Sequence, residues 1–591
     1  MCGIIGYCGK KPAVPIVLEA LKRLEYRGYD SAGIASLYDG KLVIKKDAGK
    51  IDEVIQKHSL SSLPGIVAIG HTRWATHGAV TQLNAHPHSD CGSRVAVVHN
   101  GIVENNQQLR QELTTIGHKF SSETDTEVIP HLIEDELKNG CSLEQAVLNV
   151  APRLEGSYAF LVMSLDDPGK IVGTRRNNPL IVGIDATDYY VSSDALAFSQ
   201  YTNQVMGLED NEVVMLTQEG IEFFDARGCK LVKQARKLDH SWAESNKGGY
   251  QYFMLKEIME QAQVLGQTAC QDGKRFTKIA LDILRANQVI ITACGTSRYA
   301  ALVGRYLFSK VGKKFCDVVM ASEFGYFADS VDKNTVVIAV SQSGETADVV
   351  EGVKAAKDAG AQVISIINRP NSILADLSNQ VIYLNCGAEI AVAATKSFLS
   401  QLAIFYLLSF SMVDDFDEAV ANLTRLNGEI TKVLDWNKNE LINLSQKLND
   451  KNDFYYIARG INFAIASEGA LKLKEISYIH AEGMPAGELK HGTLALIEPG
   501  MPVVVICPAD YTFSETLSNA IEAKSRGAYI IGVSDKESDI YDSWVKLPKV
   551  DELLYPMVAV VPLQLLAYYL AVSRGCDPDK PRNLAKSVTV K

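Results

Sequence analysis

Hydrophobic and polar positions alternate in two different ways along this chain. In residues 2–239, short β-rich runs such as 95–98 and 158–163 are separated by polar segments with a helical period, as at 127–138. In the second half, longer apolar runs precede turns rich in glycine or serine, and each turn leads into a helical pattern. The first pattern predicts a mixed α/β domain, and the second predicts parallel strands alternating with helices.

The second half also repeats itself. Gly295 and Gly460 follow equivalent predicted strands and are 165 positions apart, while the strands at 336–340 and 503–507 are 167 positions apart. A repeat of this length, with strand, turn and helix in that order, predicts two copies of one doubly wound unit with a parallel sheet. Ligands of such sheets bind at the carboxyl ends of the strands.

A polar segment between the two regions predicts a domain linker. Residues 237–249 end in two glycines and contain no apolar period on which an element could form. A different stretch, 553–572, has the length of a membrane span but contains Pro556, Pro562 and Gln564. We interpret it as a buried helix, and we expect no contact with a membrane.

Composition narrows the classes of protein that fit. The 591 residues suggest two to four domains, and 47% hydrophobic with 22% charged residues is typical of a globular rather than a disordered chain. The net charge of -11 would repel polyanions, so nucleic acid is not an expected partner.

The cysteines indicate a reducing environment. None of the 11 forms a CxxC pair, which fits neither a disulfide framework nor a zinc ribbon, and the first residues do not resemble a secretory signal. We therefore expect a cytoplasmic protein. His86, His88 and Cys91 offer three metal ligands without a second paired set, so we interpret them as loop packing and predict no metal site and no cofactor.

Cys2 is the most informative position in the sequence. Removal of Met1 would leave a thiol and a free α-amine on the same residue. Their ordinary pKa values, about 8.5 and about 7.7–8.0, are close enough for the amine to accept the thiol proton near neutral pH. Cys2 is thus a candidate nucleophile with its own base.

Five further blocks accompany Cys2 in order along the chain. They begin at Arg27 (RGYDSAG), His71 (HTRWATHG), Asn84 (NAHPH), His99 (HNG) and Ser122 (SETDTE). With these blocks, residues 2–239 resemble the glutaminase domain of the N-terminal-nucleophile amidotransferases. The resemblance implies an αββα fold and an activity that hydrolyses glutamine.

The resemblance also implies roles for particular residues. Cys2 would be the nucleophile, with Asn100 and the Gly101 N–H as the oxyanion hole. An amide donor and a close-approaching backbone N–H suit a tetrahedral oxyanion. The residues implied in substrate binding include Arg73 for the glutamine carboxylate and Asp125 for its amine, and the full set is Arg73, Trp74, His77, His86 and Asp125. Trp74, beside Arg73, is the candidate gate of an ammonia channel.

A turn rich in hydroxyl groups follows the strand at 336–340. Residues 341–346 read Ser-Gln-Ser-Gly-Glu-Thr and precede a helical pattern, so free N–H groups would point at an anion. No lysine follows the glycine, and GxGxxG is absent, which excludes a nucleotide P-loop. A sugar phosphate suits this turn better than a triphosphate, although an ordinary helix N-cap is the alternative for the turn alone.

The doubled unit with this turn and Cys294-Gly-Thr-Ser resembles the sugar isomerase (SIS) domains. Together with the motifs at 468–475, 486–492 and 581–590, the second half resembles the isomerase part of the glutamine:fructose-6-phosphate aminotransferases. The chain as a whole is thereby expected to be an α/β multidomain enzyme, divided into a glutaminase domain (2–239), a linker (240–249), two SIS domains (250–430 and 431–580) and a C-terminal catalytic tail (581–591).

This second resemblance implies the sugar site. Lys586 would form a Schiff base with the ketone of fructose 6-phosphate, and Glu475 would move a proton between C1 and C2 with Lys472 beside it. His491 would open the sugar ring from a neighbouring subunit, which implies a homodimer. The remaining implied residues bind the phosphate (Ser297, Ser341, Gln342, Ser343 and Thr346) or the sugar (Val392 and Ala585).

Small departures and two alternatives remain. Thr493 stands where the family usually has proline, and Met484 and Pro485 precede Ala486, where the family usually has non-proline residues. The motif therefore identifies His491 but does not define the geometry of the loop around it.

An amidophosphoribosyltransferase would need paired acids after a strand, which are lacking. A non-catalytic sugar-phosphate sensor would have lost Lys586 or Glu475. The short linker resembles that of bacterial members, so we expect no control by a nucleotide sugar.

Overall fold

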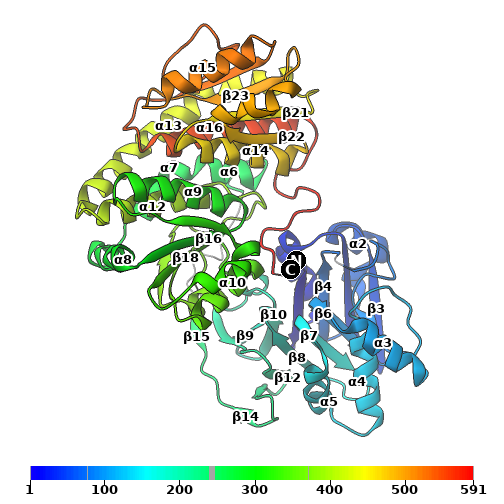
Figure 1. Cartoon of the computed structure of the whole chain (residues 1–591). Helices are drawn as coiled ribbons and strands as arrows, with labels where there is room; N and C mark the ends of the chain where they lie inside the picture. Colours follow the sequence, from blue (N-terminus) through cyan, green and yellow to red (C-terminus); the bar gives the residue numbers. More distant parts are fainter. Residues whose placement is uncertain (1, 76, 238–246, 371, 590–591) are drawn as a thin grey trace. The chain divides into compact units, whose positions relative to one another are not determined.

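The computed structural model describes residues 2–75, 77–237, 247–370 and 372–589, and the chain forms two compact units (Figure 1). The first unit contains the described residues up to 237 together with 587–589, and the second contains 247–586. Much of the expected linker, residues 240–246, lies outside the described residues.

Two antiparallel sheets form the centre of the first unit. In spatial order the first is β15 (Arg236–Lys237), β11 (Gln204–Gly207), β9 (Ile181–Asp185), β10 (Asp188–Ser192), β1 (Gly3–Cys8), β4 (Val67–Arg73), β2 (Ser31–Tyr38) and β3 (Lys41–Ala48). The second is β14 (Lys230–Leu231), β13 (Ile221–Phe224), β12 (Val213–Leu216), β8 (Ile171–Arg176), β7 (Gly156–Ser164), β6 (Val95–Val103) and β5 (His88–Ser89).

Helices cover the outer faces of these sheets. One apolar core lies between the sheets, with Ile4 of β1 against Val98 of β6. A second core joins the first sheet to α1 (Ala13–Leu24) and α2 (Ile51–His58). A third joins the second sheet to α3 (Asn106–Thr115), α4 (Val128–Lys138) and α5 (Leu143–Val150). The αββα expectation is confirmed.

Two five-stranded parallel sheets form the second unit. Their spatial orders are β17 (Asp317–Met320), β16 (Gln288–Ala293), β18 (Thr335–Ser341), β19 (Gln362–Ile367), β20 (Gln380–Tyr383) and β22 (His480–Pro485), β21 (Asp453–Ala458), β23 (Pro502–Ile506), β24 (Tyr529–Ser534), β25 (Ser543–Lys546). The two orders are equivalent in chain sequence, which confirms the internal repeat.

The parallel strands are apolar on both faces because helices cover both sides. In β18, Ile338 faces a central core that the two sheets share, while Val337 faces an outer core. The helices of this unit are α6 (Phe253–Met259), α7 (Gln261–Ala269), α8 (Gly273–Arg285), α9 (Gly295–Lys310), α10 (Ala347–Asp358), α11 (Ile373–Leu377), α12 (Lys396–Ser411), α13 (Phe416–Lys447), α14 (Asn462–Ser477), α15 (Phe513–Lys524) and α16 (Tyr555–Ser573).

Two helices bear directly on the expectations from sequence. Within the described residues, α16 alone is long and apolar enough to cross a membrane, but 83% of its most apolar window is buried inside the protein. It packs against α13 and α14 as a core helix, as expected. The 32-residue α13 runs without a break through position 430, where the expected SIS boundary falls.

Candidate functional site

Cys2 directly precedes β1, a central strand of the first sheet. Its Sγ accepts a hydrogen bond from the Trp74 N–H at 3.2 Å, and its carbonyl oxygen accepts one from Asn100 Nδ2 at 3.0 Å. Burial raises the pKa of the Cys2 thiol, while the bond from Trp74 acts to lower it. The thiol therefore needs a nearby base to react near neutral pH. Met1 lies outside the described residues.

Asn100 and Gly101 lie on β6, and the backbone at Gly101 requires glycine. Its φ is +121°, and a Cβ there would lie 2.0 Å from the carbonyl oxygen of Ser157. Because no other residue fits, the chain can present the Gly101 backbone beside the Asn100 amide. This pairing suits the expected oxyanion hole.

Arg73 and Asp125 bring opposite charges into the interior of the first unit. Both are almost fully buried, and among the described residues neither forms an ion pair. Arg73 donates instead to the carbonyl oxygens of His77, Gly78 and Ala79, and Asp125 accepts from the Val103 N–H at 2.8 Å. A buried cation and a buried anion that are near each other without a direct ion pair are suited to a zwitterionic ligand.

His86 belongs to a buried column of imidazoles. Its ring stacks on His71 with centroids 4.0 Å apart, and its Nδ1 accepts from the His99 N–H at 3.3 Å. Burial lowers the pKa of His71 to about 3 and the pKa of His86 well below its ordinary value. These rings are neutral, and His86 contacts the strand that carries Asn100.

The expected phosphate residues lie at the carboxyl ends of two adjacent parallel strands. Ser341 ends β18 and its Oγ accepts from the Gly344 N–H at 3.1 Å and lies 2.9 Å from Thr346 Oγ1. Gln342 Nε2 is buried and has no partner among the described residues. Ser297, in the first turn of α9 after the neighbouring β16, accepts from Gln401 Nε2 at 2.9 Å. Two helix N-termini thus converge where an anion is favoured.

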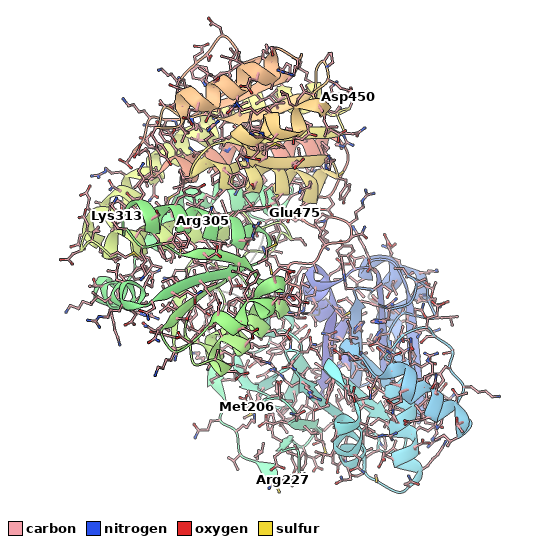
Figure 2. The ribbon with its side chains drawn as sticks, in the orientation of Figure 1. Met206, Arg227, Arg305, Lys313, Asp450 and Glu475 are labelled. Atoms are coloured by element: carbon pink, nitrogen blue, oxygen red, sulfur yellow. The ribbon has the colours of Figure 1, made fainter. Side chains whose placement is uncertain are left out.

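Lys472 and Glu475 meet on one face of α14, as their spacing predicts (Glu475 is labelled in Figure 2). Lys472 Nζ lies 2.6 Å from Glu475 Oε2 and 3.5 Å from Glu468 Oε1. Glu468 also accepts from Thr296 Oγ1 at 3.2 Å, which connects α14 to the start of α9. Burial raises the pKa of Glu468 to about 8. Sequence reasoning did not single out Glu468, although it lies four positions before Lys472.

Lys586 pairs with a carboxylate that sequence reasoning missed. Its Nζ donates to Glu389 Oε2 at 2.5 Å, and both side chains are buried. Glu389 also accepts from the Thr395 and Ser397 N–H groups. Burial acts to raise the pKa of Glu389, but the Lys586 ammonium and these donors hold it at about 2. No local motif marks Glu389, because its partner is 197 positions away.

The remaining expected sugar-site residues, Val392, Ala585 and His491, lie in three different surroundings. Val392 is buried and donates its N–H to the Asp579 carbonyl oxygen at 3.0 Å, and Ala585 is half-buried beside Lys586. His491 ends the short helix η8 (Ala486–His491) and is exposed. In the part of the chain that is described, no hydrogen bond joins its side chain to Glu475 or Lys586.

Cys91 does not stay with the two histidines that precede it in sequence. His88 Nε2 lies 3.1 Å from Thr124 Oγ1, whereas Cys91 Sγ lies 3.6 Å from His131 Nδ1 and 3.8 Å from His118 Nδ1. The three residues that are close in sequence therefore do not form one group, and Cys91 faces two imidazoles from other segments.

Glu257 adds a titratable group to the interior of the second unit. One carboxylate oxygen accepts from the Ile390 N–H at 2.5 Å, while Oε2 has no partner among the described residues. Burial and the nearby Glu389 raise the pKa of Glu257 to about 8 from 4.5. Between pH 4.5 and about pH 8, the Glu257 carboxyl is ionised in the unfolded chain and neutral in the folded chain. The contribution of Glu257 to stability therefore falls as pH rises through this range.

We therefore expect Glu257→Gln to flatten the loss of thermal stability between about pH 5 and pH 8. Melting temperatures of the wild type and the variant across this range measure the effect. Glu260→Gln is the control, because its pairing with Lys396 lowers the pKa of Glu260 although burial opposes this. Parallel pH profiles for the wild type and Glu257→Gln would contradict the expectation.

Comparison with known proteins places both units in described families. A family model described as SIS domain matches residues 282–410 and 447–574, and one described as glutamine amidotransferase domain matches 71–200. Relatives named glutamine–fructose-6-phosphate aminotransferase [isomerizing] include those of Pyrococcus horikoshii (46% identical) and Methanothermobacter thermautotrophicus (44% identical), with 100% of both chains covered in each case.

Solved structures resemble the second half. The C-terminal domain of glucosamine-fructose-6-phosphate aminotransferase from Francisella tularensis is 35% identical, with a TM-score of 0.54, 57% of this chain covered and 100% of that chain. A phosphosugar isomerase structure from Silicibacter pomeroyi, described as putative in its title, has a TM-score of 0.50 at 24% identity and bears on the fold alone.

Proposed function

The chain belongs to the glutamine–fructose-6-phosphate aminotransferase (isomerizing) family, and from this premise we propose how its residues divide the reaction. The enzyme converts glutamine and fructose 6-phosphate into glutamate and glucosamine 6-phosphate, a step of hexosamine synthesis. We assign glutamine hydrolysis to residues 2–239 and sugar chemistry to 250–430, 431–580 and the tail 581–591, with 240–249 as the linker.

In the glutamine half-reaction, the Cys2 thiolate attacks the side-chain amide carbon. The α-amine freed by removal of Met1 accepts the thiol proton, directly or through a water molecule. Asn100 Nδ2 and the Gly101 N–H stabilise the oxyanion. The amide nitrogen takes the proton from the α-amine and leaves as ammonia. Water then hydrolyses the thioester and releases glutamate. The observation that supports this assignment best is the Cys2 sulfur, held by the Trp74 N–H beside the Asn100 amide.

Glutamine is positioned through its two charged ends. Arg73 binds the α-carboxylate and Asp125 binds the α-ammonium group, so that each buried charge gains a direct partner of opposite sign. His77, whose carbonyl oxygen already accepts from Arg73, lies beside the guanidinium that binds the α-carboxylate. His86 acts through its contact with His99, which precedes Asn100 on β6.

In the sugar half-reaction, the phosphate anchors the substrate at the ends of β16 and β18. Ser341, Gln342, Ser343 and Thr346 donate from one helix N-terminus, and Ser297 donates from the other. The buried and unpartnered Gln342 amide is available to the phosphate. Val392 and Ala585 contact the sugar.

The lysine must lose a proton before it can react. In the ion pair with Glu389, Lys586 is an ammonium group and not a nucleophile. Entry of the sugar displaces Lys586 from Glu389, the ammonium group gives its proton to a water molecule, and the neutral amine adds to the C2 ketone with loss of water. Ammonia then replaces lysine at C2. Glu475 removes a proton from C1 and returns one to C2, while Lys472 stabilises the negative charge that develops.

His491 opens the fructose ring as a general acid–base from a second copy of the chain. Its exposure at the end of η8 leaves the imidazole available to a neighbouring subunit, which supports a homodimer. We further propose that the dimer is cytoplasmic and that no metal takes part in the chemistry.

Ammonia reaches the sugar without mixing with solvent, with Trp74 as the gate. Free ammonia at pH 7 would protonate and lose its reactivity, and the Trp74 backbone directly contacts the Cys2 sulfur. We expect Trp74→Ala to leave glutamate production unchanged while glucosamine 6-phosphate falls several-fold. The ratio of the two products measures coupling, and Trp436→Ala, an exposed tryptophan on α13, is the control. A ratio that stays at one in Trp74→Ala would remove Trp74 from the channel.

The overall assignment is tested by incubating the full-length protein with both substrates. We expect one glucosamine 6-phosphate for each glutamate, with fructose 6-phosphate consumed in the same amount. Glutamate formed without any amino sugar would contradict the proposed division of the reaction.

A further inference from the structure

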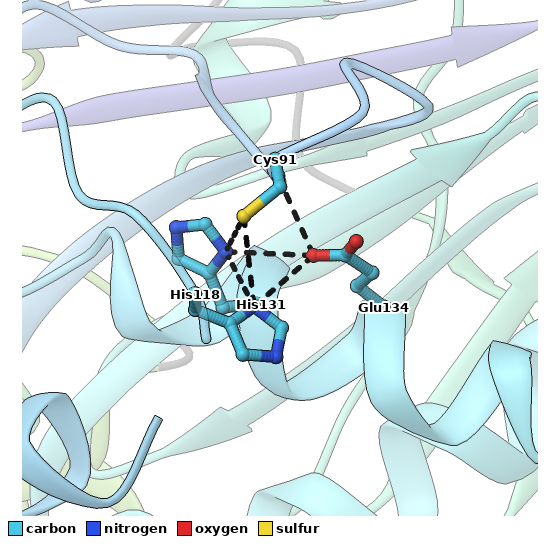
Figure 3. A group of neighbouring side chains, drawn as sticks. All are labelled: Cys91, His118, His131 and Glu134. Atoms are coloured by element: carbon cyan, nitrogen blue, oxygen red, sulfur yellow. Dashed lines mark hydrogen bonds and ion pairs between the residues drawn. The ribbon is translucent and has the colours of Figure 1, made fainter. Parts of the chain in front are cut away.

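Four side chains of the first unit converge on one point (Figure 3). Cys91 lies in the loop after β5, His118 lies in the loop between α3 and α4, and His131 and Glu134 share one face of α4 at i, i+3 spacing. One ligand atom from each residue lies within 4.8 Å of the others. No expected role in glutamine hydrolysis involves these residues.

The spacing of the four atoms is that of a tetrahedral metal site. The two histidine Nδ1 atoms are 3.1 Å apart, Cys91 Sγ lies 3.8 and 3.6 Å from them, and Glu134 Oε2 lies 3.2 and 3.5 Å from them. Zinc bonds of about 2.0–2.3 Å give tetrahedral edges of about 3.3–3.6 Å. These five separations agree with the edges to within a few tenths of an ångström, and the sixth, between Cys91 Sγ and Glu134 Oε2, is at most 4.8 Å.

The outer atoms of His118 and Glu134 are held so that lone pairs face the centre. His118 Nε2 lies 2.9 Å from Asp135 Oδ1, and a proton donated there leaves Nδ1 free to coordinate. Glu134 Oε1 accepts from Lys138 Nζ at 2.7 Å, which leaves Oε2 for the cluster. The Lys119 N–H lies 3.4 Å from Cys91 Sγ and donates to the sulfur.

Charge and burial fit a divalent cation. A Cys91 thiolate and a Glu134 carboxylate together carry two negative charges, and two neutral imidazoles complete the set. His118, His131 and Glu134 are at most 9% exposed.

We propose that Cys91, His118, His131 and Glu134 bind one Zn²⁺ as a structural site. Four protein ligands leave no open position for a substrate, so the metal would not take part in the chemistry. It would join two loops to α4, which begins at Val128, three positions after Asp125. The site thus braces the segment that binds the glutamine amine. This proposal replaces the expectation from sequence that Cys91 takes part in loop packing alone.

Metal content of the full-length protein tests the proposal. Protein purified without a metal-affinity column and dialysed after zinc loading should retain about one Zn per chain by elemental analysis. Cys91→Ser and His131→Gln should each lose at least about four-fifths of that metal. Cys229→Ser, which changes another exposed cysteine of the same unit, should retain it. Far-ultraviolet circular dichroism and a cooperative thermal transition report whether each variant folds, because the substitutions lie in the first unit and the activity of the second unit would not show it.

Cobalt gives a second measurement that does not depend on any variant. Replacement of zinc by Co²⁺ in the wild type should produce the intense visible bands of tetrahedral cobalt and a thiolate-to-metal charge-transfer band. Removal of metal with a chelator should lower the melting temperature of the wild type by about 5 °C or more, and zinc should restore it. A wild type that retains no zinc above the Cys91→Ser level, or a cobalt form without the charge-transfer band, would overturn the site.

Discussion

Cys2→Ala is expected to abolish glutamine hydrolysis while the sugar chemistry continues. The variant removes the only atom proposed to attack the amide, so glutamate formation should fall by at least about 10³-fold. The proposed sugar-site residues up to Lys586 belong to the second unit, and Cys2 belongs to the first. Conversion of fructose 6-phosphate into glucose 6-phosphate should therefore stay within about two-fold of wild type. Separate assays for glutamate and glucose 6-phosphate measure the two activities.

Cys8→Ser would be a poor control for this experiment because Cys8 is fully buried in the core between the sheets. Cys229→Ala is better, since Cys229 is exposed and lies in the same unit. It should keep both activities. Equal loss of both activities in a folded Cys2→Ala protein would contradict independent sites.

Lys586→Arg should produce the opposite result. Arginine preserves the ion pair with Glu389 but cannot form a Schiff base, because its guanidinium stays protonated. Formation of glucosamine 6-phosphate should fall by at least about 10³-fold, while glutamine hydrolysis continues. The loss should appear in kcat rather than in sugar binding, since the phosphate residues are unchanged.

Borohydride trapping tests the covalent step directly. Wild-type protein incubated with fructose 6-phosphate and the reductant should gain the mass of the reduced sugar adduct, and Lys586→Arg should not. Lys580→Arg, six positions earlier, is the matched control and should be trapped like the wild type. A trapped adduct in Lys586→Arg would show that another lysine forms the Schiff base.

Local sequence patterns were sufficient for most of the architecture. The helix expected at 127–138 is α4, and the apolar stretch at 553–572 is the buried α16. The repeat of strand, turn and helix corresponds to two sheets with equivalent strand orders. These features depend on period, turn chemistry and glycine placement, which involve residues close together in the sequence. The course of α13 across residue 430 could not be predicted in this way, because a continuous helical period contains no signal of a domain boundary.

The candidate site also contains residues that local patterns indicated and partners that they did not. Cys2, the Ser341 turn and the pair of Lys472 and Glu475 were predictable, since each is a local arrangement whose spacing or resemblance indicates its chemistry. The partners of Lys586 and Cys91 were not. Glu389 is 197 positions from Lys586, and His131 is 40 positions from Cys91. Contacts between distant segments are determined by how strands and helices pack, so the tertiary structure alone decided which carboxylate holds the lysine and which imidazoles face the cysteine.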